Sequence, residues 1–257
     1  MPLNLKETLV LGISATALFD LSESDKLFRE EFEKDPDNAI ATYRKYMLEN
    51  EDKALEEGIG FPLVKALLSL NKYQEKGQSP LVEVVIMSRN SPDTGIRVLN
   101  TIRKLGLKIN RSAFTAGESS ADYLEAFDVD LFLTTNESDA QKVIDNGVCA
   151  SAILCTPPEY KSSIPEGQVR IAFDGDAVLF DETSELVYKE QGMDAFHQNE
   201  DSSQDIPMNE GPFANFLKKL AKLQERLPMK VEFSPVRIAI VTARNSPSEM
   251  RVIKTLR

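Results

Sequence analysis

The chain repeats itself, and this internal repeat constrains its fold more than any other feature. Residues 88–103 read SRNSPDTGIRVLNTIR and residues 242–257 read TARNSPSEMRVIKTLR, so both contain the block Arg-Asn-Ser-Pro. Each block follows an apolar, β-branched run, Val82–Met87 or Val236–Val241, and leads into a stretch with apolar residues at helical spacing. One plan of strand, long insert, strand and helix is therefore used twice.

The beginnings of the two copies also match, although more weakly. Ile13–Ser24 and Asp174–Glu185 share Leu-Phe-Asp at positions 18–20 and 179–181. The repeat therefore favours a buried strand within the apolar run Thr8–Phe19 over the core of a signal peptide, which the run superficially resembles. No other apolar stretch approaches the roughly 18 residues that a membrane span needs, so we expect no contact with a membrane.

Only the second copy carries acidic residues at the end of its first strand. Residues 171–178 read IAFDGDAV, an apolar run that ends in Asp174 and Asp176. Side chains two positions apart on a strand point to the same side, so both carboxylates would lie close enough to share a cation and a phosphate. The first copy has Ile13-Ser14-Ala15 at this place and cannot perform the same chemistry.

A calcium-binding loop is one alternative for this acidic segment. Counted from Asp174 as position 1, Glu185 falls at position 12, as such a loop requires. Val178 and Leu179, however, occupy positions 5 and 6, where a ligand and a glycine are needed, and this excludes the calcium loop. A turn with two solvated acids stays open as a purely structural alternative.

Charge and composition exclude several functional classes. The formal net charge of −11 and the lack of a long basic run argue against a nucleic-acid partner, although a local cationic pocket can still hold a small phosphorylated substrate. Cys149 and Cys155 have the spacing of neither a CxxC redox pair nor a zinc knuckle, and we interpret them as reduced core residues. The single histidine, His197, excludes mechanisms and zinc sites that need several histidines.

Taken together, the motifs resemble those of the cytosolic type-I 5′-nucleotidases, within the haloacid dehalogenase superfamily. Asp-Gly-Asp after a β run, a helical insert and a second β run that ends at Thr242 match the first two motifs of the superfamily. The matching segments run along nearly the whole chain: Ala17–Asp20, Gly60–Val64, Ser88–Val98, Asp130–Asp139, Val169–Glu185, Lys189–His197, Glu210–Pro212 and Val241–Arg257.

The resemblance implies an α/β fold of two related, doubly wound, Rossmann-like units with helical, cap-like inserts. Residues 1–155 would form a degenerate unit of haloacid dehalogenase type and residues 156–167, rich in Pro and Ser, a linker. Residues 168–257 would form the catalytic unit, with a cap-like insert at about 182–230.

The second unit is expected to be incomplete. The superfamily places a Lys and an acidic pair after the position of Thr242, and no counterpart of them precedes Arg257. We therefore expect weak or no phosphatase activity from these residues alone.

The resemblance also implies a reaction, the Mg²⁺-dependent hydrolysis of a nucleoside 5′-monophosphate such as AMP or IMP. Asp174 would attack the phosphorus and form an aspartyl-phosphate. Asp176 would protonate the leaving 5′-oxygen and later take a proton from water. Mg²⁺ would be held by the Asp174 carboxylate and the Asp176 backbone carbonyl, and Thr242 would donate a hydrogen bond to a phosphoryl oxygen.

Four further residues are candidates for substrate binding: Arg244, Asn245, His197 and Gly211. Arg244 and Asn245 recur in the first copy, so a structural role in the turn fits equally well. His197 lies in the cap-like insert, where an ordinary surface position is the alternative, and Gly211 with the following Pro fits a helix start.

The inserts are expected to be mostly helical. Apolar residues recur at helical spacing in Glu30–Asn50, Phe61–Asn71 and Gly211–Leu227, and the apolar face of the last segment is assigned to packing. Gln198–Glu210 is acidic and polar, and we expect a flexible loop there.

Two other functions stay open beside the nucleotidase. One is a non-catalytic nucleotide-binding or scaffolding protein, and the other is a phosphotransferase of the same superfamily. The expected partner is a small nucleoside monophosphate, the expected compartment is the cytoplasm, and homo-oligomer formation stays open.

Overall fold

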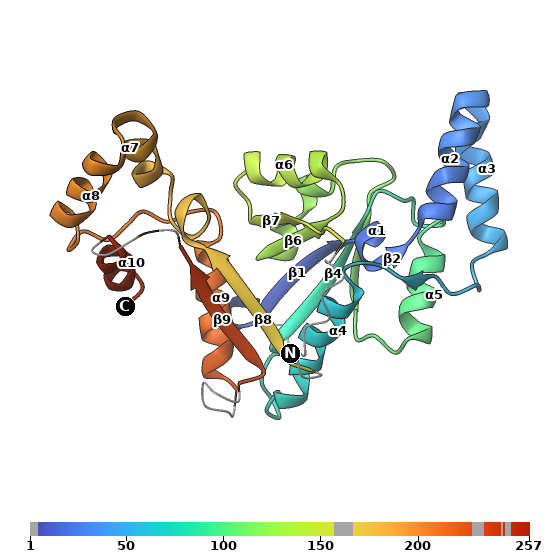
Figure 1. Cartoon of the computed structure of the whole chain (residues 1–257). Coiled ribbons are helices and arrows are strands. Elements are labelled where there is room, and N and C mark those ends of the chain that lie inside the picture. The colour runs from blue at the N-terminus through green and yellow to red at the C-terminus, as the bar shows by residue number, and fades with distance from the viewer. Residues whose placement is uncertain (1–4, 157–166, 228–233, 243, 245–247) are drawn as a thin grey trace. The chain divides into compact units, whose positions relative to one another are not determined.

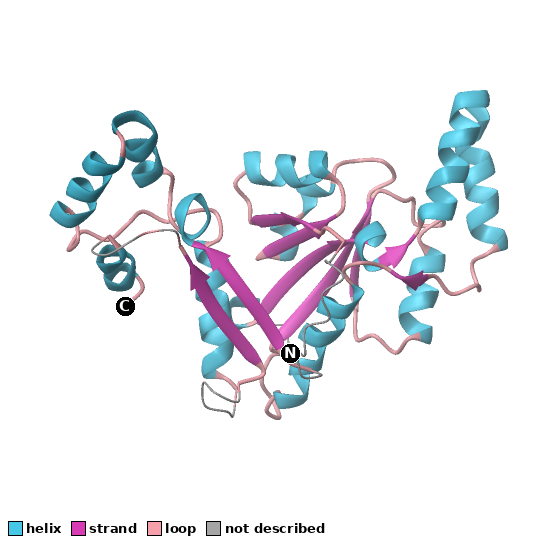
Figure 2. Cartoon of the chain, in the orientation of Figure 1, coloured by secondary structure: helices cyan, strands magenta, loops and turns pink. Residues whose placement is uncertain are grey.

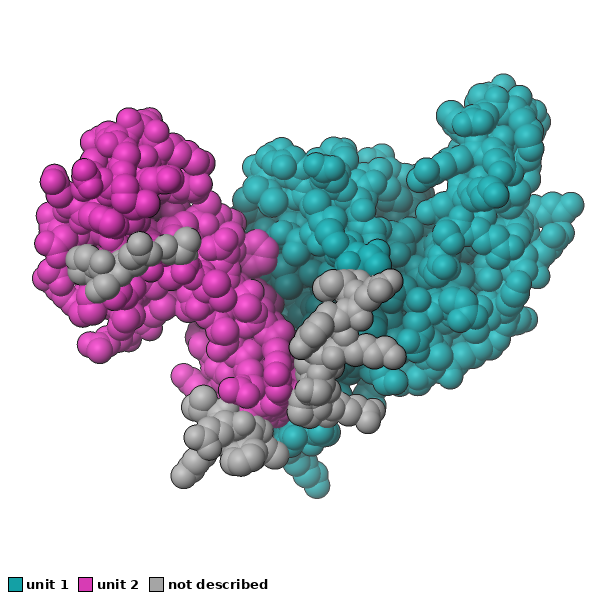
Figure 3. Space-filling model, viewed as in Figure 1, with its two compact units in different colours: residues 1–167 teal, residues 168–257 magenta. Residues whose placement is uncertain are grey.

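The computed structural model describes residues 5–156, 167–227, 234–242, 244 and 248–257. The chain divides into two compact units, Met1–Gly167 and Gln168–Arg257, which Figure 3 shows in separate colours. The expected linker at 156–167 falls almost wholly outside the described residues. No helix that the structure describes has the length and apolar character needed to cross a membrane.

The first unit is built on a five-stranded sheet in which all neighbouring strands are parallel (Figure 1). The strand order is β5-β4-β1-β6-β7. The strands span Leu9–Ser14 (β1), Val82–Ser88 (β4), Arg111–Phe114 (β5), Leu131–Thr134 (β6) and Ala150–Ile153 (β7). From β1 the chain passes to β4 and β5 on one side and then crosses to β6 and β7 on the other. The strand order therefore reverses beside β1, as in doubly wound sheets. The expected α/β, Rossmann-like fold is confirmed.

Helices and turns connect these strands (Figure 2). The helices of the first unit span Ala15–Leu18 (α1), Ser22–Lys34 (α2), Pro36–Glu49 (α3), Phe61–Ser69 (α4), Ile96–Lys104 (α5) and Glu137–Asp145 (α6). Short 3₁₀ turns lie at Leu5–Glu7, Leu70–Tyr73, Ser120–Tyr123 and Glu125–Phe127. A two-stranded antiparallel ladder joins β2 (Phe19–Asp20) to β3 (Glu56–Glu57).

Both faces of β1 are covered, and every residue of this strand is buried. On one face, Val10 belongs to an apolar cluster with Phe132 of β6 and Val143 of α6. On the other face, Ile13 lies against the start of α4, where a Cβ atom on Gly60 would come within 2.8 Å of it. A strand covered on two sides is apolar without alternation, and the buried strand predicted within Thr8–Phe19 is confirmed.

The segment Glu30–Asn50 is helical, as expected, and it contains the end of α2 and the whole of α3. Asp35 separates α2 from α3, and its side chain accepts a hydrogen bond from Asn38 N at 3.4 Å. Pro36 follows in the first turn of α3, where its missing N–H leaves no helical bond unmade. The Asp-Pro pair thus ends one helix and caps the next.

The second unit pairs β8 (Val169–Asp174) with β9 (Val236–Val241) in parallel, in register from Val169 and Val236 to Asp174 and Val241. Its helices span Thr183–Gln191 (α7), Met193–Ser202 (α8), Ala214–Glu225 (α9) and Glu249–Thr255 (α10). Phe216 of α9 packs edge-on against Phe173 of β8, with ring centroids 5.9 Å apart. The packing role expected for the apolar face of α9 is thereby confirmed.

Two expectations for the second insert need correction. The flexible loop predicted at Gln198–Glu210 is helical in its first part, because α8 continues to Ser202. The helix predicted from Gly211 begins three residues later, at Ala214. The many charged residues of this segment suggested a loop, but its first part is a helix, and one of its charged residues is buried.

The internal repeat is reproduced at the level of single hydrogen bonds. In the first unit, Arg97 Nε donates to the carbonyl oxygen of Lys53 at 3.0 Å. In the second unit, Arg251 Nε donates to the carbonyl oxygen of Ile206 at 3.0 Å. Each arginine lies in the helix after the Arg-Asn-Ser-Pro block and holds a point within the insert of its own unit.

A threonine in the same helix makes a second matching contact. Thr101 Oγ1 accepts a hydrogen bond from Leu55 N at 3.1 Å, and Thr255 Oγ1 accepts one from Met208 N at 3.1 Å. Arginine and threonine together hold two residues, two positions apart, in each insert. These residues recur because they anchor the framework, independently of any chemistry.

Candidate active site

The chain turns sharply after β8. Asp174 is the last residue of the strand and is exposed, and a short helical turn, Gly175–Leu179, follows it. Within the turn, Asp176 is extended at φ −78° and ψ 135°, and Ala177 takes the left-handed conformation at φ 58° and ψ 9°. The expectation that Asp176 continues the strand was wrong, since the strand has ended two residues earlier.

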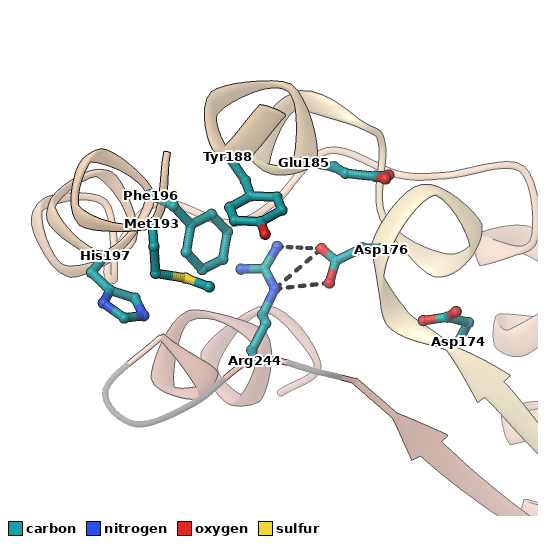
Figure 4. Close-up of a pocket in the computed structure, with 8 residues that line it drawn as sticks. All are labelled: Asp174, Asp176, Glu185, Tyr188, Met193, Phe196, His197 and Arg244. Atoms are coloured by element: carbon teal, nitrogen blue, oxygen red, sulfur yellow. Dashed lines mark hydrogen bonds and ion pairs between the residues drawn. The ribbon is translucent and has the colours of Figure 1, made fainter. Parts of the chain in front are cut away.

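The two carboxylates nevertheless face one cavity of about 360 Å³ (Figure 4). Helices α7 and α8 supply one wall, and the ends of β8 and β9 supply the other. The lining residues are Asp174, Asp176, Glu185, Tyr188, Met193, Phe196, His197 and Arg244. The cavity therefore combines acidic, cationic and aromatic side chains within the second unit.

Arg244 forms the centre of the site (Figure 4). Its Nε donates to both carboxylate oxygens of Asp176 at 3.1 Å, and its Nη2 contacts the same group. Its Nη1 pairs with Glu200, and the guanidinium carbon lies 5.4 Å from the ring centroid of Phe196. The arginine side chain is only 2% exposed. Burial opposes its charge, but hydrogen bonds and the charges of Asp176 and Glu200 outweigh this and raise the pKa of Arg244.

Thr242 connects the end of β9 to the same carboxylate. Its Oγ1 donates to Asp176 Oδ2 at 3.4 Å and accepts the backbone N–H of Arg244 at 3.2 Å. The Thr242 hydroxyl thus contacts both the backbone of Arg244 and the carboxylate of Asp176. Thr242 lies at the carboxyl end of β9, as the sequence predicted.

Glu200 is a polar residue of this region that sequence reasoning missed. Its side chain is 0% exposed, although it lies in the stretch that was expected to be a flexible loop. One signal could have revealed it. Phe196 and Glu200 are four residues apart, so a helix would turn both to the same side.

Aromatic residues of α7 and α8 form the wall opposite the carboxylates. Tyr188 packs edge-on against Phe196, with ring centroids 6.3 Å apart at 78°. His197 is half-buried and lies 5.8 Å from Phe196 between ring centroids. His197 thus lines the cavity instead of facing only solvent.

Gly211 lies away from the cavity lining and supports its base. Its N–H donates to the carbonyl of Leu179 at 2.9 Å, and a Cβ atom here would come within 2.4 Å of the Phe180 oxygen. Gly58 does the same in the first unit, where its N–H donates to the carbonyl of Leu18 at 2.9 Å. The same contact in the unit without the acidic pair supports a structural role for this glycine, the alternative given to substrate binding. The remaining candidate, Asn245, lies outside the described residues.

The corresponding place in the first unit carries hydroxyl groups. Ser14 Oγ lies 3.2 Å from Thr16 Oγ1, which lies 3.4 Å from Thr135 Oγ1. The arginine of its block, Arg89, pairs with Asp139 of α6. This edge offers no carboxylate at the place of Asp174 or Asp176.

The oxygen atoms of the second unit allow a test of whether Mg²⁺ fits. Asp174 presents an exposed carboxylate, and Asp176 adds a backbone carbonyl in the next turn. Across the described residues, no group of three His, Cys, Asp or Glu side chains could hold a metal. Mg²⁺ usually keeps several waters and takes one or two carboxylates together with substrate phosphate, and the residues present fit a site of this kind.

The parallel strands and the cavity that joins two carboxylates to an arginine define an α/β protein with a candidate site at the ends of β8 and β9. The chain belongs to the 5′-nucleotidase family, whose model matches residues 1–257. A curated relative, cytosolic 5′-nucleotidase 1B of Homo sapiens, is 32% identical over 258 aligned positions. The alignment covers 98% of this chain but only 41% of the relative. No solved structure matches the chain.

Proposed function

We propose that the second unit contributes the reacting groups for Mg²⁺-dependent hydrolysis of nucleoside 5′-monophosphates. One observation carries this proposal: two carboxylates line one cavity but have different surroundings. Among the described residues, Asp174 has no ion-pair partner, whereas Asp176 is bound by Arg244 and Thr242. Asp174 is thus open to an incoming phosphate, whereas its two partners hold Asp176 at the cavity, where a group that exchanges a proton with the substrate must be positioned.

The proposed reaction has two steps. Asp174 attacks the phosphorus, so that an oxygen–phosphorus bond forms on its carboxylate while the bond to the nucleoside 5′-oxygen breaks. Asp176 gives the leaving oxygen a proton and then removes one from the water that hydrolyses the aspartyl-phosphate. Thr242 donates its hydroxyl to a phosphoryl oxygen, as its place beside Asp176 allows.

The Asp174 carboxylate and the Asp176 carbonyl would hold the metal. When bound, Mg²⁺ supplies positive charge that offsets the repulsion between the carboxylate and the phosphate. The aromatic wall of Tyr188, Phe196 and His197 is the side of the cavity suited to a purine base, for which AMP and IMP are the proposed substrates.

Activity of these 257 residues alone is proposed to be weak or absent. The cavity lining, as far as the described residues form it, includes one arginine but no lysine. That arginine is already occupied by two carboxylates. Little positive charge is therefore free to stabilise the transferring phosphoryl group.

The proposal is tested by measuring phosphate release from AMP and IMP, with and without Mg²⁺, beside nucleotide binding by calorimetry. We expect binding together with slow, Mg²⁺-dependent release that disappears in Asp174→Asn. Chelation of Mg²⁺ with EDTA should abolish release. Release that persists unchanged in Asp174→Asn would contradict the proposed nucleophile.

The same measurements separate the two other functions. A non-catalytic nucleotide-binding protein would bind AMP and release no phosphate under any condition. A phosphotransferase would yield a new nucleotide when a nucleoside acceptor is added. The named relative is called cytosolic, and we propose the same compartment for this chain, which carries two cysteines and no disulfide between them.

A further inference from the structure

The Glu200 carboxylate joins several elements of the second unit, and no step of the proposed reaction uses it. It accepts a hydrogen bond from Ser184 Oγ of α7 at 2.7 Å and from Arg251 Nη1 of α10 at 3.0 Å. Its other oxygen pairs with Arg244, after β9. A completely buried acid is retained where several partners satisfy it, and here the partners come from three separate elements.

The four charged groups of this network balance one another. Two carboxylates, Asp176 and Glu200, face two guanidinium groups, Arg244 and Arg251. Arg244 binds Asp176 through Nε and Nη2 and binds Glu200 through Nη1. Both edges of the planar Arg244 guanidinium are therefore occupied. The edge formed by Nε and Nη2 meets Asp176, and Glu200 holds the opposite side through Nη1.

The internal repeat supplies an independent comparison. Met47 lies six residues before Lys53, as Glu200 lies six residues before Ile206, and both side chains are buried. Lys53 and Ile206 are the carbonyl partners of the two repeated arginines. β1 ends at Ser14 as β8 ends at Asp174, so Thr16 occupies the place of Asp176 in the first unit. The unit without this acid thus has an apolar residue at the place of the buried acid.

We propose that Glu200 is a positioning residue: it fixes the guanidinium of Arg244 so that Arg244 holds the Asp176 carboxylate toward the cavity. Through Ser184 and Arg251, the same carboxylate ties helices α7 and α10 to this arrangement. The inference rests on the proposed function for its catalytic consequence, but the positioning itself is a property of the unliganded protein.

The first test compares Glu200→Gln with Glu190→Gln, a matched change at an exposed position of α7. Misplacement of a reacting group by about 1 Å can lower the rate about 100-fold, so we expect kcat of Glu200→Gln to fall between about tenfold and 100-fold. KM should change by less than about twofold, because the cavity wall is intact. Glu190→Gln should retain both constants.

The second test needs no turnover. The Nε–H proton of Arg244 gives an NMR signal, which Arg244→Lys assigns by its loss. In the wild-type chain this proton should exchange slowly, because the side chain is 2% exposed. In Glu200→Gln it should exchange at least about tenfold faster, since the guanidinium has lost one of its two anchors. An unchanged signal would overturn the proposal.

A third variant separates positioning from stability. Glu200→Met with Arg251→Met removes one buried charge of each sign and avoids leaving an unpaired ion. We expect the double variant to fold with a melting temperature near that of the wild type, and both kcat and the Arg244 signal to stay impaired. Recovery of kcat with the melting temperature would show that Glu200 acts only on stability. If the wild-type chain neither binds AMP nor releases phosphate, the proposed function fails, while the NMR measurement still decides the positioning role.

Discussion

Arg244 Nε lies 3.1 Å from each carboxylate oxygen of Asp176, so one donor bridges both oxygens of the candidate acid/base group. The contact joins the turn after β8 to the turn after β9. The arginine holds the Asp176 carboxylate in place, and Asp176 therefore competes with any entering anion for the same guanidinium. The phosphate of a substrate must share the guanidinium with Asp176.

Replacement of Asp174 tests the nucleophile directly. Asp174→Asn keeps the shape of the side chain but removes the charge that attacks phosphorus, so the slow release of phosphate from AMP should disappear. Nucleotide binding should persist, because the cavity walls are unchanged. Asp181→Asn is the matched control, since Asp181 lies outside the cavity lining and receives its hydrogen bonds from Thr183 and Asn209.

Replacement of Arg244 should affect stability as well as function. Arg244→Met leaves Asp176 without its guanidinium partner and leaves Glu200, fully buried, with Arg251 alone. Removing one partner of a buried ion pair typically costs about 3–5 kcal/mol, so the unfolding free energy of the second unit should fall by about 3 kcal/mol. Urea denaturation followed by circular dichroism measures the loss. A change below about 1 kcal/mol would show that the network is not a buried one.

The two repeated glycines predict equal effects in the two units. Gly58→Ala places a Cβ atom 2.7 Å from backbone atoms of Leu18 and Phe19, and Gly211→Ala places one 2.4 Å from the Phe180 oxygen. Backbone atoms cannot move aside easily, so each variant should lose about 1–3 kcal/mol of stability.

Gly12→Ala is the control for the glycine variants. The nearest atoms there belong to side chains at 3.2 Å, which can move by a few tenths of an ångström, so the loss should be smaller. Thermal unfolding of the three variants measures the difference. If Gly12→Ala is as destabilising as the other two, the backbone contact is not the cause.

The two cysteines should differ in reactivity with pH. Burial raises the pKa of Cys149 to about 12, with a smaller contribution from the charge of Asp130. The thiolate is the reactive form, so at pH 8 only about one in 10,000 of the Cys149 thiols is charged. Cys155 is exposed. Iodoacetamide at pH 8 should therefore label Cys155 and leave Cys149 unmodified until the protein unfolds, as mass spectrometry of the peptides can show.

The sequence predicted those parts of the fold that depend on local pattern. The Arg-Asn-Ser-Pro repeat and the apolar runs before it placed β4 and β9, and the acidic pair placed one edge of the cavity. It failed where neighbouring turns decide the conformation. β8 ends at Asp174, and Asp176 lies in the turn Gly175–Leu179, in which Ala177 is left-handed. The boundary between α2 and α3 at Asp35 and Pro36 is likewise set by a local turn.

The largest gap concerned Glu200. A glutamate among other polar residues looks solvated, and its burial depends on partners at Ser184, Arg244 and Arg251, far away in the sequence. Charge balance inside a folded unit is a property of three dimensions. The sequence holds one sign of the burial of Glu200: the apolar Met47 occupies the corresponding position of the first copy.

The paired anchors of Arg97 with Thr101 and of Arg251 with Thr255 have a consequence for how such a chain can change over generations. They fix the insert of each unit without using any residue of the cavity. A duplicated gene can therefore lose the acids of one copy and still encode a foldable product. In this chain, the residues that anchor the inserts are therefore distinct from those that line the cavity, and natural selection can act on each set separately.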